Sequence, residues 1–327
     1  SNTTGTSNVG VGAFALNSNT TASGNTAVGY QAGYSNQTGT FSLFVGKGAG
    51  YNNTTSYQTA MGYEALYSAT TGGFNTAVGF KAAYYNTTGS NNTAFGHGSL
   101  YTNTIGANNI AIGPDALRFN TTGGANVAVG VEALTSNTTA SENTAVGYQA
   151  SYSNTTGAPS VAVGFQAMRL NTTGTGVAVG SQALQNNTTG GSNTGIGQNA
   201  LNANTTGSFN TALGKHALIS NTTGSYNTAV GYKAGYSLTN AGYNVAIGYQ
   251  ALYSNTTSYG ENIAIGANAL YNTTDGWENI AIGRNAGNDN TTGIRNIFIG
   301  DGAGNYCTAD NNTIIGRFTG NYGPLDI

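Results

Sequence analysis

The sequence predicts an all-β protein, a parallel β-solenoid (β-roll), and two observations carry this prediction. A glycine returns 19 times between Gly12 and Gly316, and the 18 intervals comprise fourteen of 17 residues, three of 16 and one of 18. The same phrase surrounds each glycine, as in residues 227–234 (NTAVGYKA). A short fixed period along a whole chain is typical of a solenoid, whose coils are stable only when they stack on one another.

The first element of each coil is a predicted strand directly before the glycine. The residue before the glycine is Val, Ile, Met, Phe or Leu in all 19 coils, and the residue three before it is Thr, Val, Ile or Leu. The residue between them is mostly Ala, and this alternation predicts a short strand. We expect the β-branched face to form the core. We expect the Ala/Gly face to be flat enough for a second chain to associate through it.

The second element is a predicted return strand that ends in a turn. Ala occurs three residues after the glycine in 17 of 19 coils, and Leu or Gly follows it, as at Leu66 and Gly33. The phrase Asn-Thr-Thr-Gly then predicts a turn, and Asn precedes the next strand, as at Asn75. Because stacking places equal positions above one another, the two Asn columns are expected to form amide ladders. The density of glycine excludes helix.

The organisation that we expect is one solenoid rod over residues 1–320, followed by an irregular tail at 321–327 that could cap the rod or form a joint. Coils spaced by ~4.8 Å give a rod on the order of 86 Å long. No polar capping coil is visible in the sequence, although solenoid ends normally need one. We therefore expect either continuation in a longer chain or head-to-tail docking into a filament.

Composition excludes several classes of partner. Only 6% of the residues are charged and the net charge is −2, which gives no field to attract nucleic acid. No run approaches the ~18 apolar residues that would predict insertion into a membrane. Cys307 is the only cysteine, which excludes a disulfide framework within the chain. It is either a substitution in a turn column or an intermolecular bridge.

The repeated phrase resembles a known family. Residues 244–248 (NVAIG), 262–266 (NIAIG) and 279–283 (NIAIG), each followed three residues later by Ala, resemble the head repeats of trimeric autotransporter adhesins. They are also similar to repeats in the shafts of phage tail fibres. The resemblance covers about residues 7–320. It implies a left-handed β-roll, often trimeric, with the β-branched pair inside and the small residues toward partner chains.

No catalytic, metal or cofactor site is expected. Asp115 and Glu132 stand two residues after the glycine in successive coils, and stacking would bring them within roughly 5 Å, as in a retaining glycosidase. That spacing follows automatically from stacking, and no other acid surrounds the pair. Glu64 and Lys81 in the same column are interpreted as a surface ion pair. His97 and His216 are seven coils apart and cannot share a site.

Two aromatic columns leave two interpretations open, either stacking that stabilises the rod or a chain–chain interface, or a stripe that stacks on sugars. The first column stands five residues after the glycine. Its candidate binding stripe consists of Tyr34, Tyr51, Tyr67, Tyr84 and Tyr101, and the column resumes at Tyr236, Tyr253 and Tyr271. The second stands five residues before the glycine and contains Phe41, Tyr57, Phe74, Phe209, Tyr226 and Tyr243.

The turn column also leaves two interpretations open. Asn-Thr-Thr is both a good turn and ladder phrase and an acceptor for N-glycosylation. The candidate glycosylation sites are Asn2, Asn19, Asn36, Asn53, Asn86, Asn120, Asn137, Asn154, Asn171, Asn187, Asn204, Asn221, Asn255, Asn272 and Asn290. We expect these turns to form an exposed edge that carries sugars where the source has a glycosylation system.

These features favour a structural fibre segment at the cell or virion surface, adhesive or surface-coating, and not an enzyme. The expected partners are further copies of the chain, as a trimer or a head-to-tail filament, and a carbohydrate or cell-surface receptor. The alternative is a phage tail-fibre or tail-spike segment that binds or cleaves surface polysaccharide. Asp115 and Glu132 would be its catalytic pair.

Overall fold

The chain folds into strands and turns. The computed structural model describes residues 2–256 and 258–317, and these residues contain 19 strands and no helix. The chain divides after Gln166 into two compact units, residues 1–166 (unit 1) and residues 167–327 (unit 2). Each coil of about 17 residues contributes one short strand, so the predicted parallel β-solenoid is confirmed. The predicted tail at 321–327 lies outside the described residues.

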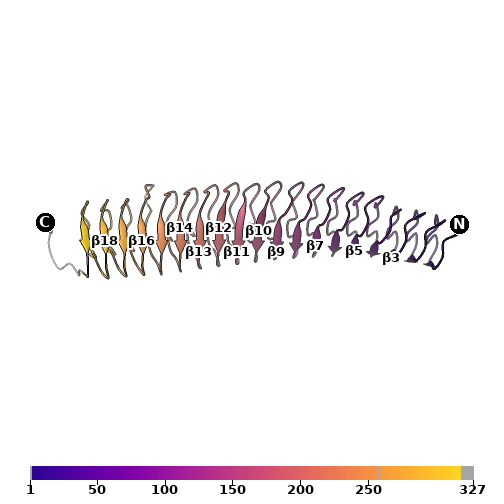
Figure 1. The fold of residues 1–327 in the computed structure, drawn as a ribbon, viewed down its shortest axis with the longest axis horizontal. Helices are drawn as coiled ribbons and strands as arrows, with labels where there is room; N and C mark the ends of the chain where they lie inside the picture. The colour runs from indigo at the N-terminus through magenta and orange to yellow at the C-terminus, as the bar shows by residue number, and fades with distance from the viewer. Residues whose placement is uncertain (1, 257, 318–327) are drawn as a thin grey trace. The chain divides into compact units, whose positions relative to one another are not determined.

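Unit 1 contains strands β1 to β10, which pair in parallel with their neighbours in chain order. The strands are β1 Val9–Val11, β2 Thr26–Val28, β3 Leu43–Val45, β4 Thr59–Met61, β5 Thr76–Val78, β6 Thr93–Phe95, β7 Ile110–Ile112, β8 Val127–Val129, β9 Thr144–Val146 and β10 Ser160–Val163. Equal positions of the repeat stand opposite each other, as Val9 pairs with Thr26 and Thr26 with Leu43. The repeat period therefore fixes the register of the sheet. Figure 1 shows the labelled strands β3, β5, β7, β9 and β10 of this unit following one another in chain order.

Unit 2 contains strands β11 to β19, which follow the same parallel, in-register arrangement. The strands are β11 Gly176–Val179, β12 Asn193–Ile196, β13 Thr211–Leu213, β14 Thr228–Val230, β15 Val245–Ile247, β16 Ile263–Ile265, β17 Ile280–Ile282, β18 Ile297–Ile299 and β19 Thr313–Ile315. The interval of 18 residues between Gly248 and Gly266 leaves the register unchanged, since Val245 still pairs with Ile263. The extra residue is therefore accommodated outside the strands.

Alanine and leucine line the interior, and the β-branched residues point outward. In the coil of β8, Ala128, Ala133 and Leu134 are fully buried, whereas Val127 and Val129 are half-buried. The prediction that the β-branched face forms the core is therefore wrong. The reason is the narrowness of the coil, because a Cβ built on Gly10 would lie 3.9 Å from the Cβ of Ala15 across the interior. Two alanines facing each other already fill that space.

The predicted return strand is also wrong, because this segment is a series of turns. The residues two and four positions after the glycine have left-handed backbone angles, with φ of 57° at Glu132 and 50° at Leu134. Left-handed residues at alternate positions prevent an extended conformation. The segment still bonds to the next coil, since the Leu134 amide donates to the Ala150 carbonyl at 3.0 Å.

Large and small core residues compensate each other at two places. Phe44 replaces the usual Ala of the strand, and glycine replaces the usual Leu at positions 33 and 50 beside it. A Cβ built on Gly33 would lie 2.8 Å from Cδ2 of Phe44, so the ring occupies the space that Leu side chains fill elsewhere. Phe298 is buried in the same way beside Gly287 and Gly304 in unit 2. The interior therefore has a fixed volume per coil.

We predict that Phe44→Ala lowers the free energy of unfolding by about 3–5 kcal/mol, because it leaves a cavity between two glycines. Phe41→Ala in the same coil removes a ring that is 62% exposed, and it is expected to cost about 1 kcal/mol, the value of a surface aromatic pair. Chemical denaturation measures both. The triple variant Phe44→Ala/Gly33→Leu/Gly50→Leu, which copies the ordinary coil, should regain most of the lost stability. A failure of the triple variant would contradict the compensation.

Candidate functional site

The most regular polar feature is a pair of buried asparagine ladders. The first, which we call the turn ladder, stands seven residues after the glycine. The Nδ2 of Asn120 donates to Oδ1 of Asn103 in the preceding coil at 2.8 Å and to the Gly123 carbonyl at 2.9 Å. The same two bonds recur at Asn137, with Asn120 Oδ1 at 2.8 Å and the Ala140 carbonyl at 3.0 Å. The ladder therefore connects consecutive coils inside the protein.

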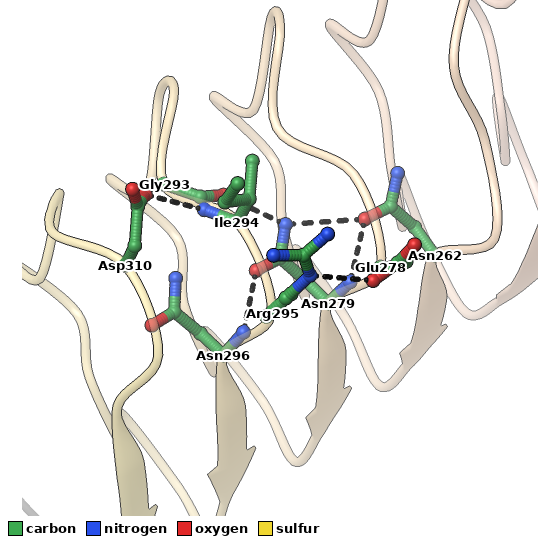
Figure 2. A network of polar contacts seen from close by, with 8 residues as sticks. All are labelled: Asn262, Glu278, Asn279, Gly293, Ile294, Arg295, Asn296 and Asp310. Atoms are coloured by element: carbon green, nitrogen blue, oxygen red, sulfur yellow. Dashed lines mark hydrogen bonds and ion pairs between the residues drawn. The ribbon is translucent and has the colours of Figure 1, made fainter.

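The second ladder, which we call the strand ladder, stands four residues before the glycine. Figure 2 shows it in unit 2, where Oδ1 of Asn262 accepts bonds from the backbone amide and the Nδ2 of Asn279, at 3.0 and 3.2 Å. The Nδ2 of Asn279 also donates to the Gly293 carbonyl at 2.8 Å, across the same coil. This carbonyl also accepts from Asn290 of the turn ladder, at 3.1 Å. Both ladders thus converge on one glycine, and the predicted amide ladders are confirmed.

The turn ladder places almost every candidate glycosylation site in the interior. The following side chains are at most 2% exposed: Asn19, Asn36, Asn53, Asn86, Asn120, Asn137, Asn154, Asn171, Asn187, Asn204, Asn221, Asn255 and Asn290. A glycan needs the Nδ2 atom that donates within the ladder. The prediction that these asparagines form an exposed edge is therefore wrong, and the ladder accounts for the repeated phrase.

The two remaining candidates are not fully buried. Asn2 is exposed near the start of the chain, at the turn-ladder position, and its Nδ2 donates to the Gly5 carbonyl at 2.7 Å. Asn272 is half-buried, and its Nδ2 donates to Oδ1 of Asp289 at 2.8 Å. The ladder position of its coil is taken by Thr273, which is buried. These two sites do not form a column.

The candidate aromatic stripe is a continuous stack in unit 1. Ring centroids are 4.9 Å apart between Tyr34 and Tyr51 and between Tyr51 and Tyr67, then 5.1 Å to Tyr84 and 5.5 Å to Tyr101. The rings of each pair are within 19° of parallel. Burial, followed by the nearby Tyr51 phenol, raises the pKa of Tyr67. The Tyr67 phenol is therefore uncharged at neutral pH.

Stacking occupies the ring faces that a sugar would need. In the second aromatic column, Tyr57 and Phe74 also stack, at 4.9 Å and 7°. The outer end of that stack is covered too, because a Cβ built on Gly24 would lie 2.8 Å from Cδ1 of Phe41. These contacts support the interpretation that both columns stabilise the coils. Only ring edges and hydroxyl groups are left for contact with another molecule.

Asp115 and Glu132 have separate hydrogen-bond partners. Asp115 accepts from Arg118 at 2.7 Å and lies 3.7 Å from the His97 ring. Glu132 accepts from Nε2 of Gln149 at 2.7 Å. Each carboxylate thus bonds to a side chain other than the acid of the adjacent coil.

The predicted ion pair between Glu64 and Lys81 is confirmed, with 3.5 Å between Oε2 and Nζ.

The two histidines belong to different units. His97 is exposed and stacks on Phe80, whereas His216 is half-buried beside Asn199, at 3.3 Å.

The described part of the chain contains neither a metal-binding cluster nor a membrane-spanning helix. Among residues 2–256 and 258–317, no group of three or more His, Cys, Asp or Glu side chains is arranged to hold a metal ion. Within the same ranges there is no helix with the length and apolar character to cross a bilayer. Cys307 is half-buried at the turn-ladder position of its coil, and burial raises the pKa of its thiol.

Comparisons with protein-family models, with curated proteins and with solved structures found no match to this chain.

We predict that Asn120→Asp destabilises the protein by about 3–5 kcal/mol at pH 7, because it places a carboxylate beside two acceptors in the interior. The loss should shrink near pH 4, since a protonated carboxyl group can donate to one of them. Asn108→Asp changes an exposed asparagine of the same region and serves as the matched control. Equal stability of the two variants in chemical denaturation would refute the buried ladder.

A second prediction concerns His216. Burial, then the charges of Lys215 and Lys233, lower the pKa of its ring below 6.5. Lys233→Gln is expected to raise this pKa toward its ordinary value, because it removes one neighbouring cation. An NMR titration of the ring protons, assigned by their loss in His216→Gln, measures the shift. An unchanged pKa would show that Lys233 does not act on the ring.

Proposed function

We propose that this chain is a structural element of an extracellular fibre that assembles by association of its copies side by side. The observation that supports the proposal is the outward face of the strands. We define this strand face as the residues one and three positions before each repeated glycine, such as Thr76 and Val78. None of these positions is charged in any of the 19 coils. Surface of this kind is typical of the centre of a protein interface.

The residues that flank the strand face have the composition of a rim. The position after the glycine contains Tyr63 and Phe80, but also Lys47 and Arg284. The position five before it contains aromatic residues such as Phe41, small or polar residues such as Asn108, and charged ones such as Glu142. An apolar centre with a partly charged margin is the arrangement found in interfaces between proteins.

The area of the face is sufficient for stable association. Four residues at ~3.3 Å and a coil spacing of ~4.8 Å give about 60 Å² per coil. The nine or ten coils of one unit then offer roughly 600 Å², which is of the same order as the ~800 Å² that each partner contributes to a standard interface. A second copy of the chain fits best, because it has the same coil spacing and an equally uncharged face. The backbone bonds of the sheet are already made between coils, so side chains carry the association.

The proposed location outside the cell rests on composition. A charged fraction of 6% and one cysteine suit a fibre that depends on stacking instead of disulfides. Adhesion or coating of a surface is the use that such a fibre supports. The ladders and stacked rings act within the protein, and the faces that they leave exposed are available for contacts.

We predict that Phe95→Lys/Ile112→Lys converts the assembled protein into single chains, because it buries two charges in the strand face of adjacent coils. Ile105→Lys/Thr122→Lys is the matched control. Ile105 is as exposed as Phe95, at 56%, but lies in the turn. Sedimentation equilibrium is expected to show a dimer or larger assembly for the wild type and for the control. A monomeric wild type would exclude assembly through this face.

A further inference from the structure

Four of the lysines and arginines of this protein pair with carboxylates, and all four lie outside the segment between Glu142 and Glu261. Lys81 bonds Glu64 at 3.5 Å, Arg118 bonds Asp115 at 2.7 Å and Arg284 bonds Asp301 at 3.0 Å. Figure 2 shows a further pair, in which Arg295 donates to Glu278 at 2.9 Å. In all four pairs the partners lie in the same coil or in adjacent coils. A carboxylate neighbour is thus the rule for the described cations outside this segment, and Lys47, which lies 5.4 Å from the centroid of the Tyr63 ring, is an exception.

The segment between Glu142 and Glu261 breaks this rule, since it contains no aspartate or glutamate. In the coils of β13 and β14 it nevertheless carries Lys215, His216 and Lys233. Lys215 and His216 follow Gly214, and Lys233 occupies in the next coil the position of His216, with its amide donating to the Lys215 carbonyl at 3.0 Å. The two ammonium groups are the charges that act on the His216 ring, and no carboxylate acts on it. We call these three residues the basic cluster.

Tyrosine rings hold one ammonium group of the basic cluster in position. The Nζ atom of Lys233 lies 5.0 to 5.7 Å from the ring centroids of Tyr232, Tyr236 and Tyr253. Cation–π contacts of this kind orient a lysine that would otherwise be free to rotate. A charge fixed in advance loses less entropy when it binds an anion. The cluster therefore has the pre-organisation of a binding site.

Exposed aromatic surface continues from the basic cluster along the coils. Lys215, Tyr232 and Tyr249 occupy the same position in three successive coils. The last two rings are 39% and 53% exposed and stack at 5.5 Å. A cation followed by two rings in a row offers a charge contact at one end and apolar edges along the rest. A rigid, linear ligand with an anionic group and apolar ring faces matches this order.

We propose that the basic cluster binds an anionic polysaccharide, with a sulfate or carboxylate group of the glycan between Lys215 and Lys233 and its sugar rings against the exposed edges and hydroxyl groups of Tyr232 and Tyr249. A nucleic acid fits less well, because it needs a long track of cations, and the cluster has two lysines and one histidine. The site would supply the adhesive contact of the proposed fibre. It lies beside the strand face and its binding can be measured separately from assembly.

The test uses the full chain and a column of immobilised dextran sulfate, with neutral dextran as the reference. The wild type is expected to be retained on dextran sulfate and not on neutral dextran, and to elute as salt screens the charges. Lys215→Gln/Lys233→Gln is expected to bind at least tenfold more weakly. Lys47→Gln/Lys81→Gln, which removes two lysines of unit 1, is the matched control and is expected to bind like the wild type.

Competition experiments test the class of ligand. The three competitors are compared at equal concentrations of anionic groups. Soluble dextran sulfate should displace the protein from the column, whereas inorganic sulfate and an oligothymidylate of equal charge should not displace it. If inorganic sulfate displaced the protein equally well, the site would recognise a free anion. If the oligonucleotide displaced it equally well, the site would recognise negative charge alone. Either result overturns the polysaccharide assignment, as does equal binding of the two double variants. Loss of binding with unchanged sedimentation would leave the fibre proposal intact.

Discussion

The close stacking of successive coils is the constraint on which the rest of the structure depends. It is set at the repeated glycine, where the backbones of neighbouring coils touch. Gly180 has a φ of 133°, and a Cβ built on it would lie 2.7 Å from the carbonyl carbon and oxygen of Gly197 in the next coil. Any other residue would be strained by its backbone angle and would push the coils apart. Parallel pairing, amide ladders and ring stacks all need this spacing.

Given that spacing, each coil has a fixed and small interior, and the chain fills it in an unusual way. Small residues such as Ala128 and Ala133 face each other, and asparagines take the positions at both sides. Buried amides are tolerable where they find partners in their own coil and in the neighbouring one, as Asn120 does. The β-branched side chains of the strands remain for the outside. A polar interior and an apolar strand face therefore have one cause, and the face is what we propose copies of the chain use to associate.

The period alone was sufficient to predict the parallel strands, their register and both asparagine ladders, since stacking follows from repetition. The alternation could not show which face of the strand is buried. The same alternation of β-branched and small residues results whether the β-branched face points inward or outward. The sequence does indicate the buried side around Phe44. There a larger residue replaces the usual Ala of the strand, and the smaller Gly33 and Gly50 replace the usual Leu. Only residues that share an interior compensate in this manner. The basic cluster was missed for another reason, since Lys215 and Lys233 are distinguished by the absence of nearby acids in space and along the chain.

The central claim is that alanine and asparagine lie inside while the strand valines lie outside. Thiol reactivity tests it most directly, in a Cys307→Ser chain that also carries Phe95→Lys/Ile112→Lys to keep the strand face open. Single cysteines are placed at Ala128, at Val129 and at Thr122, an exposed turn residue, and labelled in the folded protein. The account predicts rapid labelling at positions 129 and 122 and protection at position 128. Rapid labelling at 128 with protection at 129 would contradict it and return the β-branched residues to the core.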